Sequence, residues 1–377
     1  MRNEKMSKVT EFIKRGITPK YVESDGITVI NQKCIRDNRV DLSLARLTSK
    51  DKKITEEKIL VEGDILINST GTGTLGRTAQ INKLNETVTV DTHVTIVRPS
   101  KDINHKFLGY IIRLNEPVIA SMGKGATNQI ELAASDLGNI DIMIPTKKQQ
   151  YKIVDILSAY DDLIENNLKR IKLLEKTAEL IYKEWFVNFR FPGYEKCEFI
   201  NGMPKGWDKK AIKDILMRLS RRKKVKKEEY LENGNIPVID QSRMFIGGYT
   251  NDKEAEEINI PAIVFGDHTR IVKYIDFNFA SGADGTQIIY SNNERVTQQY
   301  LYMAIKSIDL SNYSYARHFK YLKEEYIYIP DKDVSERFTK ILKNILDQIS
   351  HLREQIIKLK EARDILIPKL ITGEIEV

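Results

Sequence analysis

Cysteines, long apolar runs and an export signal are scarce or missing in this sequence. Its two cysteines, Cys34 and Cys197, form no CxxC pair and offer no disulfide framework, which favours a reducing setting. No apolar run approaches the roughly 18 residues that span a bilayer, and the charged residues 1–14 lack the apolar core of a signal peptide. We therefore expect a soluble cytoplasmic protein.

Motifs for catalysis and metal binding are also missing. There is no GxxxxGK(S/T) loop for nucleotide phosphates, and no Asn-Pro-Pro or Asp-Pro-Pro sequence of the kind that amino-methyltransferases use. Asp267 and His268 are adjacent, but no activated nucleophile stands near them. The five histidines show no metal-ligand spacing. They are His93, His105, His268, His318 and His351. We expect no catalytic residue, no metal site and no bound cofactor.

A glycine-rich segment needs separate consideration. Residues 71–76 match GxGxxG, the pattern of a dinucleotide-binding loop. Such a fold requires a helix after the glycines, whereas strand-like sequence follows here as far as Val90. We therefore interpret the segment as a tight glycine turn, which lets backbone amides approach a partner closely.

The composition is that of a charged globular protein. A chain of 377 residues exceeds one ordinary core and suits two domains with connecting elements. Hydrophobic residues make up 41% and charged residues 30%, and 60 basic residues against 53 acidic ones give a net charge of +7. This modest surplus favours a polyanionic partner without identifying it.

Two long helices with a shared register dominate the sequence. Apolar or near-apolar positions recur in alternating steps of four and three, which is the seam of a coiled coil. The first series is Ile153, Leu157, Tyr160, Ile164, Asn167, Ile171, Leu174, Ala178, Ile181 and Trp185. The second series lies 185 residues later and is Phe338, Leu342, Ile345, Ile349, Leu352, Ile356, Leu359, Arg363, Leu366 and Leu370. The lead-in residues 142–145 and 327–330 keep the same offset, so the chain is an internal duplication of one globular domain followed by one helix.

The globular segments repeat more loosely. Residues 27–32 resemble residues 236–241 at an offset of 209. Short strand-like runs at 64–68, 94–97, 262–265 and 287–290, punctuated by Gly, Asn and Asp, predict mixed α/β (α+β) domains with loop-rich sheets. We expect a first domain at 1–146, a first helix at 147–190, a second domain at 191–331, and a second helix and tail at 332–377. Pro368 should end or kink the second helix near its last turn.

Each amphipathic helix needs a partner for its seam. The economical arrangement is an antiparallel intramolecular coiled coil, which would relate the two domains by a pseudo-twofold axis and place them at opposite ends of a rod. The alternative is a coiled-coil homodimer, which loses more entropy because two molecules must associate.

Candidate DNA-binding residues lie in a basic segment and in several loops. Seven of the ten residues at 218–227 are basic and none is acidic, which is typical of a phosphate-contacting stretch or of a solvated face. Loops that combine glycine with polar side chains could read base edges or could be structural turns. The candidates are Asn68, Ser69, Thr70, Thr72, Arg77, Lys124, Thr127, Asn128, Gln129, Arg221, Arg222, Lys223, Lys224, Arg243, His268, Thr269, Arg270, Arg317, His318 and Lys320.

Taken in order, these segments resemble the specificity subunits of type I restriction-modification systems over the whole chain. The telling parts are GDILINSTGTGTLGR at 63–77, VDTHVTIVRP at 90–99, the lead-in at 142–150, WFV at 185–187 and LIPKLITGE at 366–374. The resemblance implies two target recognition domains that each read half of a split double-stranded DNA site. It also implies helices that dock two methyltransferase subunits, with restriction subunits joining this core. The partner would flip and methylate adenine using S-adenosylmethionine.

The sequence departs from the family pattern in two places. MPKGW at 203–207 supplies the family's lead-in to the second domain, but the first domain begins abruptly at 8–12. We therefore expect its opening strand to be trimmed or supplied from elsewhere. The second domain also lacks the glycine-rich loop of the first, so the halves should read different sequences. A modification-only system, an autonomous methyltransferase-nuclease and a coiled-coil scaffold without DNA selectivity remain the alternatives.

Overall fold

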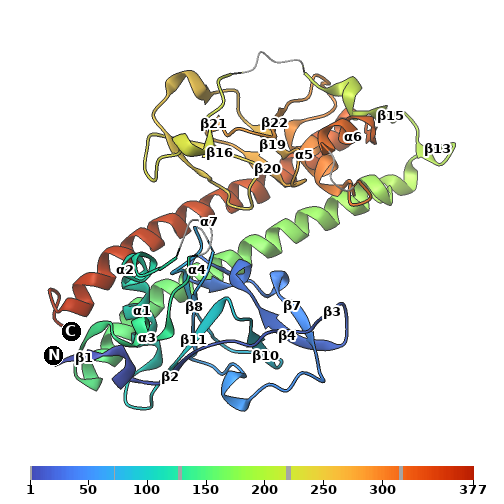
Figure 1. Ribbon diagram of the computed structural model, residues 1–377. Helices are drawn as coiled ribbons and strands as arrows, with labels where there is room; N and C mark the ends of the chain where they lie inside the picture. Colours follow the sequence, from blue (N-terminus) through green and yellow to red (C-terminus); the bar gives the residue numbers. More distant parts are fainter. Residues whose placement is uncertain (1, 72, 126–129, 218–221, 314–316) are drawn as a thin grey trace. The chain divides into compact units, whose positions relative to one another are not determined.

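The computed structural model of the chain divides into two compact units (Figure 1). It describes residues 2–71, 73–125, 130–217, 222–313 and 317–377. Unit 1 comprises Met1–Glu165 and Ile357–Val377, and unit 2 comprises Asn166–Ile356. Each unit holds one mixed α/β globular part and a portion of both long helices. The predicted fold class is confirmed.

The globular part of unit 1 is built on two four-stranded sheets. Their orders are β10-β4-β7-β3 and β2-β11-β8-β9. The strands are β2 (Thr10–Arg15), β3 (Tyr21–Val22), β4 (Gly26–Ile30), β7 (Arg46–Ser49), β8 (Ile65–Asn68), β9 (Thr78–Gln80), β10 (Val88–Val90) and β11 (Val94–Pro99). All residues of β8 are buried, and Ile65 and Ile67 among them are β-branched residues that favour a strand. Helix α1 (His105–Leu114) begins where the Asn104 side chain accepts from the backbone of Lys106 and Phe107.

Unit 2 has a similar plan, with one four-stranded and one three-stranded sheet. One sheet has the order β17-β16-β21-β18 and the other β20-β19-β22. The strands are β16 (Ile236–Ile239), β17 (Gly248–Thr250), β18 (Glu256–Glu257), β19 (Ala262–Gly266), β20 (Val272–Ile275), β21 (Phe279–Ser281) and β22 (Thr286–Ile289). β16 pairs parallel with β21 as β4 pairs parallel with β10, and helix α5 (Gln298–Ser307) corresponds to α1. β8 and β11 thus correspond to β19 and β22, where the sequence predicted strands.

The expectation about the first opening strand is wrong. β1 (Arg2–Lys5) pairs antiparallel with β12 (Asp141–Ile144), as β15 (Asp208–Ala211) pairs with β23 (Tyr326–Ile329). The RNEK sequence of β1 is polar and mostly exposed, so it carries no alternating pattern. Its pairing depends on backbone hydrogen bonds to β12, which the sequence pattern does not reveal.

The long helices pair antiparallel within each unit. α4 (Lys147–Tyr182) continues as a π-helical turn over Lys183–Val187, and α7 spans Lys332–Thr372. In unit 1, Ile153 and Leu157 share a core cluster with Ile367 and Leu370. Every predicted seam residue is buried or half-buried, which confirms the coiled-coil seam. No described helix has the length and apolar content needed to cross a bilayer.

In unit 2 the antiparallel register follows from three contacts. The buried Asn167 donates to Gln355 Oε1 at 3.1 Å. Glu175 pairs with Arg353 at 3.3 Å, and the rings of Tyr182 and Phe338 lie 6.2 Å apart. Residue numbers therefore fall along α7 as they rise along α4. Within this unit, each helix covers the apolar seam of the other.

Pro368 does not end the second helix. α7 passes through it and ends one turn later at Thr372, before Gly373 with a φ of +79°. Proline removes one backbone donor, a small loss so close to the end of a helix. The left-handed Gly373 provides the stop.

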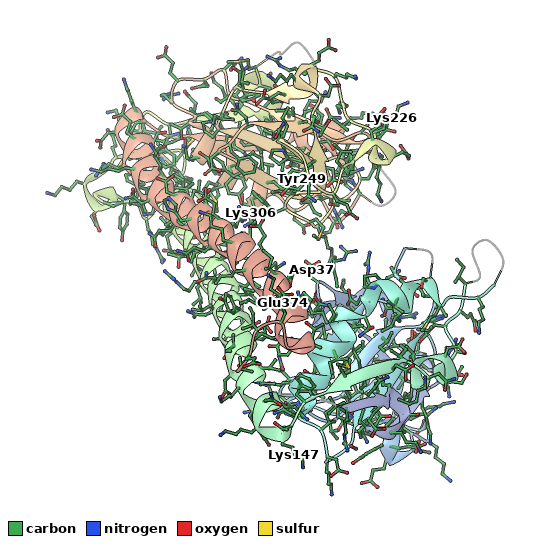
Figure 2. All side chains as sticks on the ribbon, turned by 90° about the vertical axis from the view of Figure 1, so that its left-hand side faces the viewer. Asp37, Lys147, Lys226, Tyr249, Lys306 and Glu374 are labelled. Atoms are coloured by element: carbon green, nitrogen blue, oxygen red, sulfur yellow. The ribbon has the colours of Figure 1, made fainter. Side chains whose placement is uncertain are left out.

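Side chains attach each globular part to its helices. In unit 1, the hydroxyl of Tyr110 donates to Asp161 of α4 at 2.6 Å. Asp37, which is labelled in Figure 2, lies 3.8 Å from Lys360 of α7. In unit 2, Lys306 of α5, which is also labelled in Figure 2, lies 3.4 Å from Glu179 of α4. Each domain is thus held to the helix pair by polar contacts as well as by apolar packing.

Candidate nucleic-acid interface

The glycine-rich segment of unit 1 is a turn between β8 and β9. Gly71, Gly73 and Gly76 have φ values of +97°, +75° and +86°, a region that disfavours other residues. Gly76 donates from its backbone N to the carbonyl of Asn68 at 2.9 Å, which closes the turn. Strand β9 follows directly in place of the helix that a dinucleotide-binding loop requires. The segment is therefore a glycine turn, which is the interpretation made from the sequence.

Asn68 and Ser69 lie beneath this turn. Both are fully buried. The Asn68 amide donates to the carbonyl of Gln32 at 3.1 Å, and the Ser69 hydroxyl bonds that of Thr95. Their contacts build the framework of the loop, and neither side chain is accessible to DNA in this conformation.

Thr70 stands where three loops of unit 1 meet. Its hydroxyl donates to Gln32 Oε1 at 3.1 Å and lies 2.8 Å from His93 Nδ1. Its backbone and that of Lys124 both form isolated bridges with Glu131. The structure therefore joins the predicted Thr70 and Lys124 to Gln32 and His93, which the sequence analysis did not select.

Two predicted cations lie at this convergence. Arg77 is half-buried, and its guanidinium makes no hydrogen bond or ion pair with any residue that the structure describes. The Lys124 side chain is 76% exposed and pairs with Asp136 at 2.8 Å. Both remain candidates for phosphate contact, as cations of this kind commonly make. The other predicted residues here, Thr72, Thr127, Asn128 and Gln129, lie outside the described residues.

The corresponding loop of unit 2 follows β19. His268 donates from its backbone N to Gln241 Oε1 at 3.0 Å, and Thr269 Oγ1 donates to the carbonyl of Gln241 at 2.7 Å. Arg270 has a φ of +62° and donates to the carbonyl of Leu310 at 3.1 Å. All three predicted side chains are exposed. The exposed Arg243 lies on the neighbouring loop between β16 and β17.

Helix α6 (His318–Glu324) lies against the same loop of unit 2. His318 is 5% exposed, and its ring nitrogens lie 2.9 Å from the carbonyl of Asp267 and 2.8 Å from that of Tyr313. The Asp267 carboxylate accepts from the backbone N of Phe319 at 2.8 Å, so it caps α6. His318 is therefore a framework residue.

The remaining predicted residues of this helix lie at its start. Arg317, which directly precedes α6, and Lys320 are exposed. They stay candidates for phosphate contact. Among the described residues no group of His, Cys, Asp and Glu is arranged to hold a metal ion.

The basic segment is partly engaged by its own unit. Arg222 lies 3.8 Å from Glu257, whose pKa is raised by burial. Lys223 pairs with Asp252 at 2.7 Å, which raises the pKa of Lys223 and lowers that of Asp252. Lys224 donates to the carbonyl of Thr286, the first residue of β22. Arg218 and Arg221 lie outside the described residues.

A buried lysine in unit 2 was missed. Lys273 of β20 is 5% exposed, and its ammonium donates to the carbonyls of Asp240, Met244 and Phe245 in the loop after β16. Burial lowers the pKa of Lys273 to about 8. Ala79 occupies the equivalent ladder position in unit 1. No hydrophobic pattern could have distinguished this lysine from the exposed ones.

Comparison with known proteins adds sequence evidence. The family model described as type I restriction modification DNA specificity domain matches residues 4–176 and 204–361. The MjaIX specificity subunit of a type I restriction enzyme from Methanocaldococcus jannaschii is 28% identical over 67% of this chain, which spans 65% of that relative's length. The putative MjaX specificity subunit from the same organism is 24% identical over 98% of this chain and 92% of its own.

A solved structure shares the fold. The S subunit of a type I restriction-modification system from M. genitalium matches 98% of this chain and 96% of its own, with a TM-score of 0.54 and 15% identity. The family model covers most of the sequence, in two parts that correspond to the duplication. The chain therefore belongs to the family of type I restriction-modification specificity subunits.

Proposed function

We propose that this chain is the DNA-reading subunit of a type I restriction-modification complex and catalyses no reaction itself. Unit 1 and unit 2 would each read one half of a split double-stranded target. The supporting observation is the duplicated loop cluster. The same framework holds Thr70 and Lys124 in unit 1 but His268 and Arg270 in unit 2. Different donors on one framework predict two different half-sites.

A second duplicated feature supports the docking of two methyltransferase subunits. Outside the seam, unit 1 exposes Ile156 of α4 and Ile365 of α7, with 36% and 60% of their surface accessible. Unit 2 exposes Leu180 of α4 and Ile341 of α7, with 51% and 38% accessible. The duplication offset of 185 residues relates Ile156 to Ile341 and Leu180 to Ile365. Equivalent apolar pairs in both units suit two copies of one partner.

The chemistry would belong to that partner. The methyltransferase would carry S-adenosylmethionine and flip the target adenine, because a base inside the stack cannot be reached. Restriction subunits would join the same core. The specificity subunit would contribute phosphate contacts for affinity and base contacts for selectivity.

Reconstitution tests this proposal. The chain, its methyltransferase and the complex of both are each incubated with duplex DNA and S-adenosylmethionine, and sequence-specific methylation is measured. We expect it only with the complex, while the methyltransferase alone serves as the matched control. Methylation by the isolated chain would contradict the non-catalytic role. Equal methylation by the methyltransferase without the chain would contradict the reading role.

A further inference from the structure

One glutamine occupies the same place in both units. Gln32 is the last residue of the segment 27–32 and lies two residues after the end of β4. Gln241 is the last residue of the segment 236–241 and lies two residues after the end of β16. These two segments repeat with an offset of 209. The glutamine is therefore a duplicated feature of the fold and not a chance polar residue of one loop.

In unit 1, Gln32 is bonded once to the last residue of β8 and once to the loop that follows it. Its main-chain carbonyl accepts from Asn68 Nδ2 at 3.1 Å, and its side-chain Oε1 accepts from Thr70 Oγ1 at 3.1 Å. Thr70 in turn lies 2.8 Å from His93 Nδ1, in the loop that precedes β11. The glutamine in the loop after β4 thus holds the loop after β8, and the loop after β8 contacts the loop before β11.

In unit 2, Gln241 makes the equivalent pair of bonds to the loop that follows β19. Its main-chain carbonyl accepts from Thr269 Oγ1 at 2.7 Å, and its Oε1 accepts from the backbone N of His268 at 3.0 Å. Its Nε2 also donates to the carbonyl of Asp284 at 2.9 Å, in the loop that precedes β22. The same three loops are therefore joined in both units, although the donors differ.

Glycines pack against both glutamines. A Cβ atom added to Gly71 would lie 2.8 Å from Gln32 Oε1, and one added to Gly285 would lie 2.6 Å from Gln241 Nε2. A Cβ atom at Gly266 would lie 2.8 Å from Gln241 Cβ. A Cβ atom at such a distance would force its neighbour to shift, so the loops pack tightly against both glutamines.

We propose that Gln32 and Gln241 are the positioning residues of the two recognition surfaces, each fixing the relative placement of the three loops that carry its unit's DNA-contacting groups. This inference rests on the proposed function. Neutral hydrogen bonds of this kind are individually modest, but base readout depends on placing donors within a few tenths of an ångström. Loss of the side-chain bonds therefore relaxes several neighbouring base positions of one half-site.

The test compares variants of the complete complex by sequencing the DNA that it methylates. Gln32→Met and Gln241→Met keep the approximate volume and remove the side-chain hydrogen bonds, and each serves as the control for the other. We expect each to lower discrimination by about tenfold, or about 1.4 kcal/mol, at several adjacent positions of one half-site. The other half-site should stay unchanged, and the two variants should affect different halves.

Gln32→Glu separates positioning from direct reading. Its carboxylate still accepts from Thr70 Oγ1, so we expect the wild-type base preferences to return, with weaker overall affinity from repulsion of phosphates. A change confined to one base position in either Met variant, or a switch of that base in Gln32→Glu, would show direct base reading and overturn the inference.

Two further outcomes are decisive. Met variants that keep both half-sites intact would also overturn the inference, provided that the wild-type complex methylates a split site. A wild-type complex with no split site would instead contradict the proposed function, so the two failures are distinguishable. Thermal unfolding of each variant guards against general loss of structure, because an unfolded unit abolishes methylation and does not relax one half-site.

Discussion

The buried ammonium of Lys273 should leave a signature in the pH dependence of stability. Burial holds its pKa at about 8, below the ordinary value of 10.5. Because the unfolded chain binds this proton more tightly, the free energy of unfolding should rise as the pH increases from about 8 to about 10.5. The difference of roughly 2.5 pH units corresponds to about 3 kcal/mol. Below pH 8 the lysine is charged in both states, and its contribution is constant.

Tryptophan fluorescence offers a selective assay for this effect. Both tryptophans of the chain, Trp185 and Trp207, lie in unit 2 together with Lys273. Urea unfolding followed at several pH values between about 7 and 10 gives the free energy of unfolding at each. We expect the rise in the wild type and its loss in Lys273→Met. Lys210→Met, which alters an exposed lysine of β15, is the matched control and should keep the rise.

The refuting result is a common pH slope. If the wild type and Lys273→Met gain the same free energy between pH 8 and pH 10, Lys273 is not a buried ammonium. The absolute stabilities of the two proteins do not test the pKa of Lys273. The variant removes a buried charge but also removes the donor to three carbonyls, and these effects on stability oppose each other. The slope therefore carries the test.

Three other predictions follow from the ion pairs and exposed side chains described above. Changing Arg221, Arg222, Lys223 and Lys224 together to Ser should weaken binding to cognate and random DNA equally. In a salt titration, the slope of log affinity against log salt concentration should fall by about one unit for each phosphate that the variant no longer neutralises. A selective loss of affinity for cognate DNA would show that the segment reads bases. Asp161→Ala should destabilise unit 1 by about 1–3 kcal/mol in calorimetry, because it leaves the buried Arg363 without one of its carboxylates. Arg363→Met should destabilise unit 1 less, and a larger destabilisation by Arg363→Met than by Asp161→Ala would contradict this reasoning. Ile365→Asp and Leu180→Asp should each leave only one methyltransferase subunit bound per chain in native mass spectrometry. Two bound subunits in either variant would show that these exposed apolar side chains are not docking sites.

The helices could be predicted from the sequence because their burial is periodic. The 3,4 spacing identified side chains that face a partner helix. It holds even at the polar seam residues Asn167 and Arg363, because each has a polar partner on the facing helix. The strands β8 and β19 were also predictable, because their residues are apolar and bounded by turn-forming residues.

For the proposed recognition surfaces, the sequence indicated the loops but not the burial of their side chains. Sequence composition located the loops after β8 and β19 but could not distinguish exposed from buried polar side chains. Asn68, Ser69 and His318 resemble DNA-contacting residues in sequence, yet all three are buried and donate to or bond with neighbouring residues of their own unit. Gln32 and Gln241 were visible only as the last residues of a repeated segment. Their role depends on contacts between loops that are distant in sequence, which no local pattern encodes.

The central claim is that two different recognition units read two halves of one DNA target. Sequencing of methylated bases across the genome of cells that express the chain with its methyltransferase tests it most directly, with cells expressing the methyltransferase alone as control. The account predicts a single motif of two short, different half-sites separated by a gap of fixed length and unspecified sequence. A continuous motif, or the same motif without the chain, would contradict it.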